Sequence, residues 1–246
     1  MKIEKYVKRR SECYEIVLED GNKILLHEDL ILKYELLLKK EIDSFQIDKL
    51  LKEQNNYIAY DKAIKYIARR MRSTYEIRVY LEKLEVDNNV IDEIIEKLIN
   101  QGYLNDKEYS FAYVKDRINL SNDGPYKIIN NLKQNKISDD IINLSINIFD
   151  NDLQYEKINK LISKQIKSNN SKSSYMLKQK IITNLINLGY DREIIISVLN
   201  EYDFNDSDFY KKEYDKLYNK LSKKYSGKEL EYKIKQKLYQ KGFRNE

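Results

Sequence analysis

Four segments of the chain share one spacing of apolar positions. In each, an isoleucine is followed four residues later by a leucine, and an apolar or aromatic residue comes five residues after that leucine. The members are Ile77/Leu81/Val86, Ile128/Leu132/Ile137, Ile181/Leu185/Tyr190 and Ile234/Leu238/Phe243. A spacing of four places both residues on one helix face. The leucines are 132−81 = 51, 185−132 = 53 and 238−185 = 53 residues apart, and a repeat of about this length predicts stacked helical units.

Each repeat predicts three helices. In the first repeat we expect helix A over 59–70, helix B after Ser73 as its N-cap, and helix C after Asp87. Helix C carries the clearest helical stripe of the chain, formed by Val90, Ile91, Ile94, Ile95 and Leu98. Later repeats follow the plan, with Pro125 in the first turn of a helix B and Asp191 capping a helix C. We expect polar linkers at 150–156 and 168–174, with greatest flexibility at 169–171.

The first thirty residues have a different period. Tyr14, Ile16 and Leu18 alternate with polar residues, Asp20-Gly21 follows, and the alternation resumes at Ile24. Asp-Gly between alternating segments indicates a β-hairpin, and residues 2–8 could add a third strand. Short helices should follow, one near 29–37 and another beginning at Ser44.

The sequence therefore predicts a mainly α fold. We expect an elongated, curved array of three-helix repeats, preceded by a small antiparallel hairpin or three-stranded sheet. The expected segments are an N-terminal region over residues 1–56, repeats over 57–103, 104–150 and 151–204, and a partial repeat over 205–246.

Composition excludes several kinds of site. Cys13 is the only cysteine and His27 the only histidine, so neither an internal disulfide nor a Cys/His zinc site can form. We interpret His27 as a strand-end residue rather than a catalytic one. We find no catalytic set, secretory signal or stretch of about 18 apolar residues. We therefore expect a cytoplasmic protein without enzyme activity, cofactor, metal or membrane contact. We also expect it to be a monomer.

Charge is distributed unevenly. The net charge is +5, but residues 211–246 carry 12 Lys/Arg against 5 Asp/Glu, whereas residues 87–110 carry 2 against 6. Basic residues recur near the end of each predicted helix A and the start of helix B, where they could contact phosphates or merely be solvated. The candidate DNA- or partner-binding residues are Arg69, Arg70, Arg72, Lys115, Arg117, Lys127, Lys164, Lys167, Lys220, Lys223 and Lys224.

Three motifs follow one another along the chain. The first motif is Ile67-Ala68-Arg69-Arg70-Met71-Arg72-Ser73 with Glu76-Ile77, Leu81 and Lys83; the second is Gln101-Gly102-Tyr103-Leu104-Asn105-Asp106 with Phe111, Tyr113-Val114 and Arg117; the third is Gly124-Pro125 with Ile128 and Leu132. In this order and at this spacing, the motifs resemble those of the RecX family of bacterial recombination regulators. Together they cover about residues 60–148, with weaker similarity to the end of the chain. The N-terminal hairpin resembles the extension of longer members.

The chain departs from the family at one turn. The family often has glycine before the apolar residue that follows helix B. Gly189 and Gly242 keep it in the last two repeats, but Glu85 and Lys136 replace it in the first two. We expect Asn135 to adopt the left-handed conformation in the second repeat instead.

The resemblance implies a non-enzymatic modulator of the RecA recombinase. Such a protein would bind RecA filaments on single-stranded DNA, and duplex DNA more weakly, by lodging in the filament groove or capping its ends. It would inhibit ATP hydrolysis and strand exchange during DNA repair, recombination and the SOS response. An independent helix-turn-helix DNA-binding protein is the alternative. A tetratricopeptide scaffold ranks last, because its period is about 34 residues.

Overall fold

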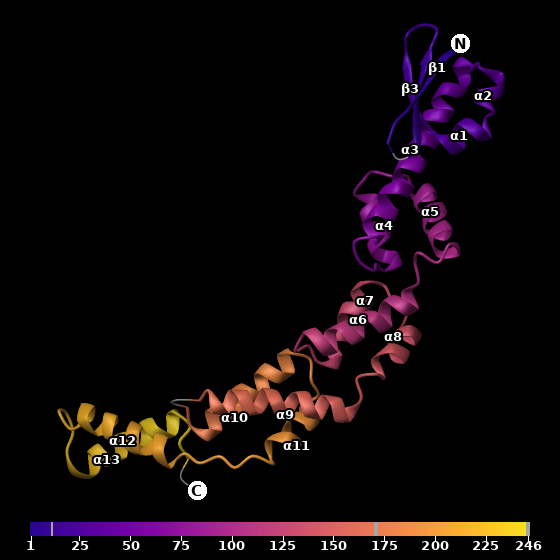
Figure 1. Cartoon of the computed structure of the whole chain (residues 1–246). Helices are drawn as coiled ribbons and strands as arrows, with labels where there is room; N and C mark the ends of the chain where they lie inside the picture. The colour runs from indigo at the N-terminus through magenta and orange to yellow at the C-terminus, as the bar shows by residue number, and fades with distance from the viewer. Residues whose placement is uncertain (11, 170–171, 245–246) are drawn as a thin grey trace. The chain divides into compact units, whose positions relative to one another are not determined.

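The computed structural model describes residues 1–10, 12–169 and 172–244, and it is mainly helical with one small sheet (Figure 1). Chain contacts divide it into two compact units, Met1–Tyr109 and Ser110–Glu246. Of the expected flexible point at 169–171, residues 170 and 171 lie outside the described residues. Among the described helices, none combines the length and the apolar character needed to span a bilayer.

The N-terminal sheet confirms the predicted hairpin and third strand. Strands β1 (Ile3–Lys8), β2 (Cys13–Leu18) and β3 (Lys23–His27) pair antiparallel in the order β1-β2-β3. Residues 16, 18, 24 and 26 point to one side and are buried, as the alternation requires. In the turn only Gly21 takes a positive φ, of 81°; Asp20 instead accepts a hydrogen bond from the Asn22 backbone N–H at 3.0 Å.

Two short helices follow where one was expected over 29–37. They are α1 (Glu28–Lys33) and α2 (Leu36–Lys39), separated by Glu35 in the left-handed region with φ 56°. His27 lies at the end of β3, as predicted, and its Nδ1 accepts a hydrogen bond from the Asp29 backbone N–H at 3.3 Å. The strand-end histidine therefore caps the next helix.

Helix α3 (Ser44–Ile67) corrects the prediction of two separate helices. It runs without a break through the boundary expected at 56/57 and through the start of helix A expected at 59. Leu50 and Gln54 face the N-terminal core, whereas Ala59 and Ala63 face the core formed with the following helices. Because the buried face changes along the helix, no single apolar stripe marks it in the sequence.

The remaining helices form successive groups. The first group joins α3 to α4 (Thr74–Glu82) and α5 (Asn88–Asn100). The next contains α6 (Asp106–Leu120), α7 (Pro125–Gln134) and α8 (Asp139–Ile146). Then come α9 (Asn151–Lys167), α10 (Ser174–Asn187) and α11 (Arg192–Leu199), and last α12 (Ser207–Leu221) and α13 (Gly227–Gln240). The linker expected at 150–156 was wrong, because Asp150 caps α9 and the helix begins at once.

The recurring apolar positions form the core, as predicted. All eight members of the isoleucine–leucine pairs are at most 2% exposed. Ile137, Tyr190 and Phe243 are also buried, and Val86 packs partly buried against the α3–α5 core. Fully burying one such side chain stabilises the fold by about 1.5–3 kcal/mol, so these positions hold each helical group together.

The turns after α4, α7, α10 and α13 share one backbone conformation. Glu85, Lys136, Gly189 and Gly242 have φ of 59°, 57°, 91° and 83°. The expectation for Asn135 was wrong, because its φ is −81° and Lys136 takes the left-handed conformation itself. The turn therefore closes in the same way with or without glycine.

Gly189 is glycine for a second reason. A Cβ atom built on it would lie 2.5 Å from the backbone nitrogen of Lys127, at the start of α7. The Gly124 N–H donates to the Leu188 carbonyl at 2.6 Å, and the Tyr126 N–H donates to the Gly189 carbonyl at 3.0 Å. The turn after α10 thus packs backbone to backbone on the start of α7, where no side chain fits.

Candidate nucleic-acid and partner interface

The segment between α3 and α4 holds the first basic cluster. Arg69 is exposed, and no described residue forms an ion pair with it. Arg70 is exposed but binds the carboxylate of Glu76 at 2.6 Å. Arg72 binds the same carboxylate at 3.2 Å, and its side chain is only 10% exposed. The three arginines therefore differ in how far they are available to a phosphate.

Arg72 supports the fold around the start of α4. Its guanidinium lies 3.8 Å from the centre of the Tyr66 ring, and that ring stacks on Tyr80 with centroids 4.2 Å apart. Glu76 also accepts the Ser73 backbone N–H at 3.1 Å and thereby completes a capping box. Because these groups bind one another, Arg72 contributes to this helix start rather than to an exposed basic surface.

The pKa of Glu76 lies below its ordinary value of 4.5. Burial by itself raises this pKa, but the hydrogen bonds from Ser73, Arg70 and Arg72 and the charge of Arg70 outweigh burial. The carboxylate is thus held ionised as the anchor of the cluster. Spacing could have revealed it, because Glu76 stands three residues after the N-cap serine.

In the second unit, two further candidate residues form ion pairs with Asp123. Lys127 binds its carboxylate at 2.7 Å, and a guanidinium nitrogen of Arg117 lies 3.8 Å from it. The Arg117 guanidinium also lies 4.9 Å from the Tyr113 ring centre. Lys115, on the same helix as Arg117, is exposed and forms no ion pair with a described residue. Asp123 therefore neutralises some of the charge that the sequence predicted here.

Lys157 joins this region, although no sequence signal singled it out. Its Nζ donates to the Ser121 carbonyl at 2.9 Å. Burial lowers the pKa of Lys157 and the nearby Lys160 lowers it further, whereas Asp123 acts in the opposite direction. Burial together with the charge of Asp123 raises the pKa of Tyr190 to about 12. The cluster around Asp123 is thus partly buried and contributes to the fold.

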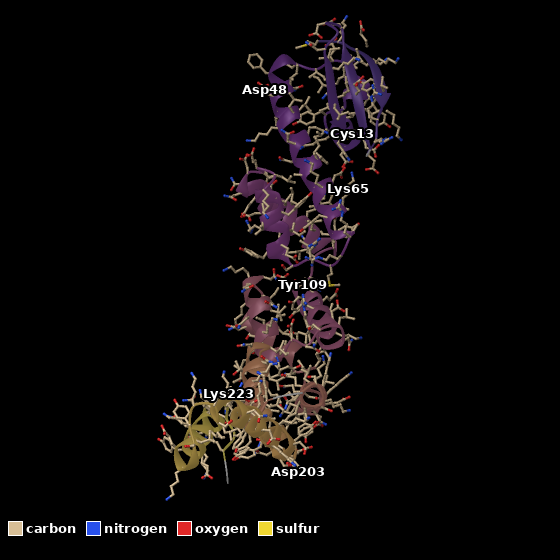
Figure 2. All side chains as sticks on the ribbon, turned by 90° about the vertical axis from the view of Figure 1, so that its left-hand side faces the viewer. Cys13, Asp48, Lys65, Tyr109, Asp203 and Lys223 are labelled. Atoms are coloured by element: carbon tan, nitrogen blue, oxygen red, sulfur yellow. The ribbon has the colours of Figure 1, made fainter. Side chains whose placement is uncertain are left out.

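The candidate lysines of the last two helical groups are exposed or partly exposed. Lys164 and Lys167 line an open hollow of about 430 Å³ with Lys160 at the end of α9. Lys220 lies in the last turn of α12, and Lys223 and Lys224 follow that helix; Lys223 is labelled in Figure 2. No described carboxylate lies within ion-pair distance of these five candidates. Of the predicted binding cations, those without an ion pair to a described residue are therefore Arg69, Lys115, Lys164, Lys167, Lys220, Lys223 and Lys224.

Proteins of known name are similar to this chain over most of its length. A protein of Listeria monocytogenes serotype 4a named Regulatory protein RecX is 32% identical over 193 residues, which cover 78% of this chain and 72% of the relative. The chain belongs to the RecX family. A RecX protein of Bacillus cytotoxicus is 33% identical over 198 residues, covering 79% of this chain and 73% of its own. The family's domain described as "RecX, first three-helix domain" matches residues 59–98, which begin within α3 and end in α5.

Solved structures agree with the RecX fold. A crystal structure of regulatory protein RecX covers 81% of this chain and 98% of its own, with a TM-score of 0.70 and 24% identity. The structure of RecX from Lactobacillus salivarius covers 59% of this chain and 95% of its own, with a TM-score of 0.56 and 30% identity. The helical architecture of this chain is thus shared with RecX proteins of known structure.

Proposed function

We propose that this RecX-family protein binds RecA and RecA filaments on single-stranded DNA and inhibits their ATPase, recombinase and strand-exchange activities in DNA repair. Membership of a family of regulatory proteins over more than three quarters of the chain carries this proposal. We further propose that single-stranded DNA is bound more strongly than duplex DNA, that the protein acts as a monomer in the cytoplasm, and that it performs no catalysis. The five-segment division of the chain stays a prediction.

The cations without acidic partners support a contact with phosphates. Arg69, Lys115 and the two lysine groups at the ends of α9 and α12 occupy comparable places, near the end of the first helix of each helical group. Exposed cations without carboxylate partners can exchange solvent counterions for phosphates at little desolvation cost. Arg70, Arg117 and Lys127 remain in the proposed set as flanking residues that would have to exchange a carboxylate partner for a phosphate. Arg72, which is only 10% exposed, supports the start of α4 instead.

The deciding experiment measures ATP hydrolysis by RecA on single-stranded DNA while this protein is added. We expect the rate of ATP hydrolysis to fall as the concentration of this protein approaches the concentration of its binding sites on the filament. Unchanged hydrolysis at severalfold excess would contradict the proposal. Charge reversal of Lys220, Lys223 and Lys224 to glutamate should weaken inhibition. Reversal of Lys211, Lys212 and Lys216, which are exposed earlier on the same helix, changes the net charge equally and is the control.

Arg69 gives a second variant that leaves the fold intact. Reversal of all three arginines would also break the Glu76 network, and loss of inhibition could then reflect unfolding. Arg69→Glu alone avoids this, since Arg69 forms no ion pair with a described residue. Circular dichroism should show unchanged helicity. Normal inhibition by this variant would remove Arg69 from the proposed set.

Helix-turn-helix recognition of duplex DNA is the alternative. Such a site needs free side chains at the start of the recognising helix. At the start of α4, Glu76 binds two arginines and Arg78 binds Asp92, so those two side chains are already engaged. A gel-shift comparison of duplexes with random single strands, without RecA, separates the two functions. A strong preference for one duplex sequence would favour the alternative.

A further inference from the structure

The outer face of α13 carries an alternating row of basic and aromatic side chains. Lys228, Tyr232, Lys235 and Tyr239 follow one another at spacings of four, three and four. At about 100° per residue, these four positions fall within about 60° of the helix circumference. Another face buries Ile234 and its neighbours in the core shared with α12. The row is exposed and lies at the edge of the core that α13 shares with α12, and α12 lies beside α13 in Figure 1.

Three residues of this row line an open groove of about 450 Å³. Tyr232, Lys235 and Tyr239 line it together with Tyr210, Phe243 and Arg244. Tyr210 and Phe243 meet edge to face with centroids 5.9 Å apart. Tyr232 and Tyr239 stay 65% and 63% exposed. Large aromatic surface left in water at two places in one groove adds little to folding and is available to a ligand.

The cations of the groove have no acidic partner among the described residues. The Arg244 guanidinium lies 3.7 Å from the Tyr175 ring centre and 5.6 Å from that of Tyr239, so it sits against aromatic rings. Lys235 forms no ion pair with a described residue, and no described carboxylate lines the groove. Glu213, a neighbouring acid on α12, is bound to Lys241. The groove is thus positively charged and aromatic at once.

This chemistry selects one class of ligand. Exposed aromatic rings next to Lys and Arg bind single-stranded nucleic acids, because unpaired bases stack on the rings while the cations hold the backbone. A duplex hides the faces of its bases and offers only the phosphates. Tyr232 and Tyr239 are seven residues apart, roughly 10 Å along the helix axis, so two bases of one strand can stack with Lys235 between them.

We propose that the α13 groove is a stacking site for single-stranded DNA, in which Tyr232 and Tyr239 stack on bases while Lys235 and Arg244 contact phosphates. The choice of DNA rests on the proposed function, which places the protein on RecA–DNA filaments. The site is distinct from the candidate cations of the helical groups, none of which lies on α13. It would give the chain a contact with DNA that does not depend on RecA.

The test uses the full chain and labelled oligothymidine without RecA, with binding followed by fluorescence anisotropy. Tyr232→Ala with Tyr239→Ala should weaken binding by about tenfold or more per ring lost. Tyr232→Phe with Tyr239→Phe should bind like the unaltered protein, because the rings remain. Both positions are exposed and helical, so circular dichroism should stay unchanged. Equal binding by the alanine and unaltered proteins would overturn the proposal.

Lys235 and Lys237 form a matched pair. Both are exposed on α13, but Lys237 does not line the groove. Lys235→Gln should weaken oligothymidine binding. It should also make the fall of log affinity with log salt shallower, by about 0.7 in slope, whereas Lys237→Gln should leave that slope unchanged. Equal effects of the two would show diffuse charge attraction and overturn the proposal. The proposal would also be overturned if the tyrosine-to-alanine variant lost as much affinity for duplex DNA as it loses for oligothymidine.

Photocrosslinking locates the contact directly. An oligonucleotide carrying 5-iododeoxyuridine should crosslink to Tyr232 or Tyr239, identified by mass spectrometry of the peptides. Crosslinks confined to other residues would contradict the stacking site, as would equal affinity for an acidic peptide or self-association through the groove. An RNA oligomer bound more tightly than DNA would contradict the assignment of DNA. RecA-dependent ATPase, measured on the same variants, tests the proposed function separately.

Discussion

The carboxylate of Asp206 accepts hydrogen bonds from both the backbone N–H and the hydroxyl of Ser174, the first residue of α10, at 2.6 and 2.5 Å. Asp106 makes the same backbone contact to Thr74, the first residue of α4, at 2.8 Å. Both pairs are 32 residues apart. The corresponding first residue of α7 is Pro125, which has no N–H to satisfy. The first backbone N–H of a helix, which has no partner within the helix, is thus bound by a distant aspartate in two groups and is absent in a third group, where proline stands first.

The two aspartates should stabilise the joints between successive helical groups. We expect Asp206→Ala to lower the free energy of unfolding by about 1–2 kcal/mol, because the partly buried donors lose their acceptor. Asp106→Ala should act similarly on the first unit. Urea denaturation measures both effects. Asp203→Ala, an exposed change shortly before Asp206, should stay within about 0.5 kcal/mol; an equal cost at Asp203 would refute the assignment.

Glycine is required at Gly189, whereas the corresponding residue of the first repeat is Glu85. Gly189→Ala should cost several kcal/mol, because its Cβ would overlap the Lys127 backbone and its φ of 91° is rare for a residue with a side chain. Glu85→Gly should instead stabilise by about 0.5–1 kcal/mol, since Glu85 adopts a φ of 59° at a cost that glycine avoids. Thermal unfolding of both variants checks the opposite signs. Destabilisation of similar size at both positions would contradict this explanation.

Glu76 should make stability depend on pH in the acidic range. Its folded-state pKa lies below 4.5, so its ionised form stabilises the fold above that value, and this stabilisation is lost as pH falls through the folded-state pKa. Glu76→Gln should cost about 1–3 kcal/mol at pH 7, and the gap to the unaltered protein should narrow as the pH is lowered below 4.5. Chemical denaturation at several pH values measures it. A gap that stays constant would show that the carboxylate charge is unimportant.

Tyr190 should have the opposite effect in the alkaline range. Its pKa of about 12 in the folded protein exceeds its ordinary value of 10.0. The unfolded chain therefore loses this proton first, and stability falls as pH rises from about 10 to 12. Tyr190→Phe should remove the part of this alkaline fall in stability that comes from Tyr190. At neutral pH it should change stability by less than about 1 kcal/mol. Denaturation curves at neutral pH and at a pH between the two pKa values test this. Identical alkaline losses in both proteins would contradict a shifted Tyr190.

Local signals account for the elements that the sequence predicted well. Ser73, Pro125 and Asp191 begin helices because caps and proline act through neighbouring backbone groups. The apolar pairs are buried because their spacing fixes one helix face. Helix α3 was missed as a single element, since it serves two cores in turn and its pattern changes midway.

The candidate site was harder to predict, because availability depends on distant partners. Arg69 and Arg72 are alike in sequence, yet Arg69 has no ion pair with a described residue, whereas Arg72 lies over Tyr66 with its charge held by Glu76. Lys127 is likewise occupied by Asp123. Composition predicts how many cations a segment has, but folding decides which remain unpaired.

The sequence by itself determined the repeat, the helix starts marked by caps or proline, and the buried apolar pairs, because each follows from periodicity and from contacts within a few residues along the chain. Only the tertiary structure decided where a ligand could bind. The groove on α13 needs Tyr210 from α12 and Arg244 from beyond the helix, and Arg244 is held in place by Tyr175 from α10. No local sequence pattern predicts that these residues lie together, since this depends on how the last helices pack against the group before them.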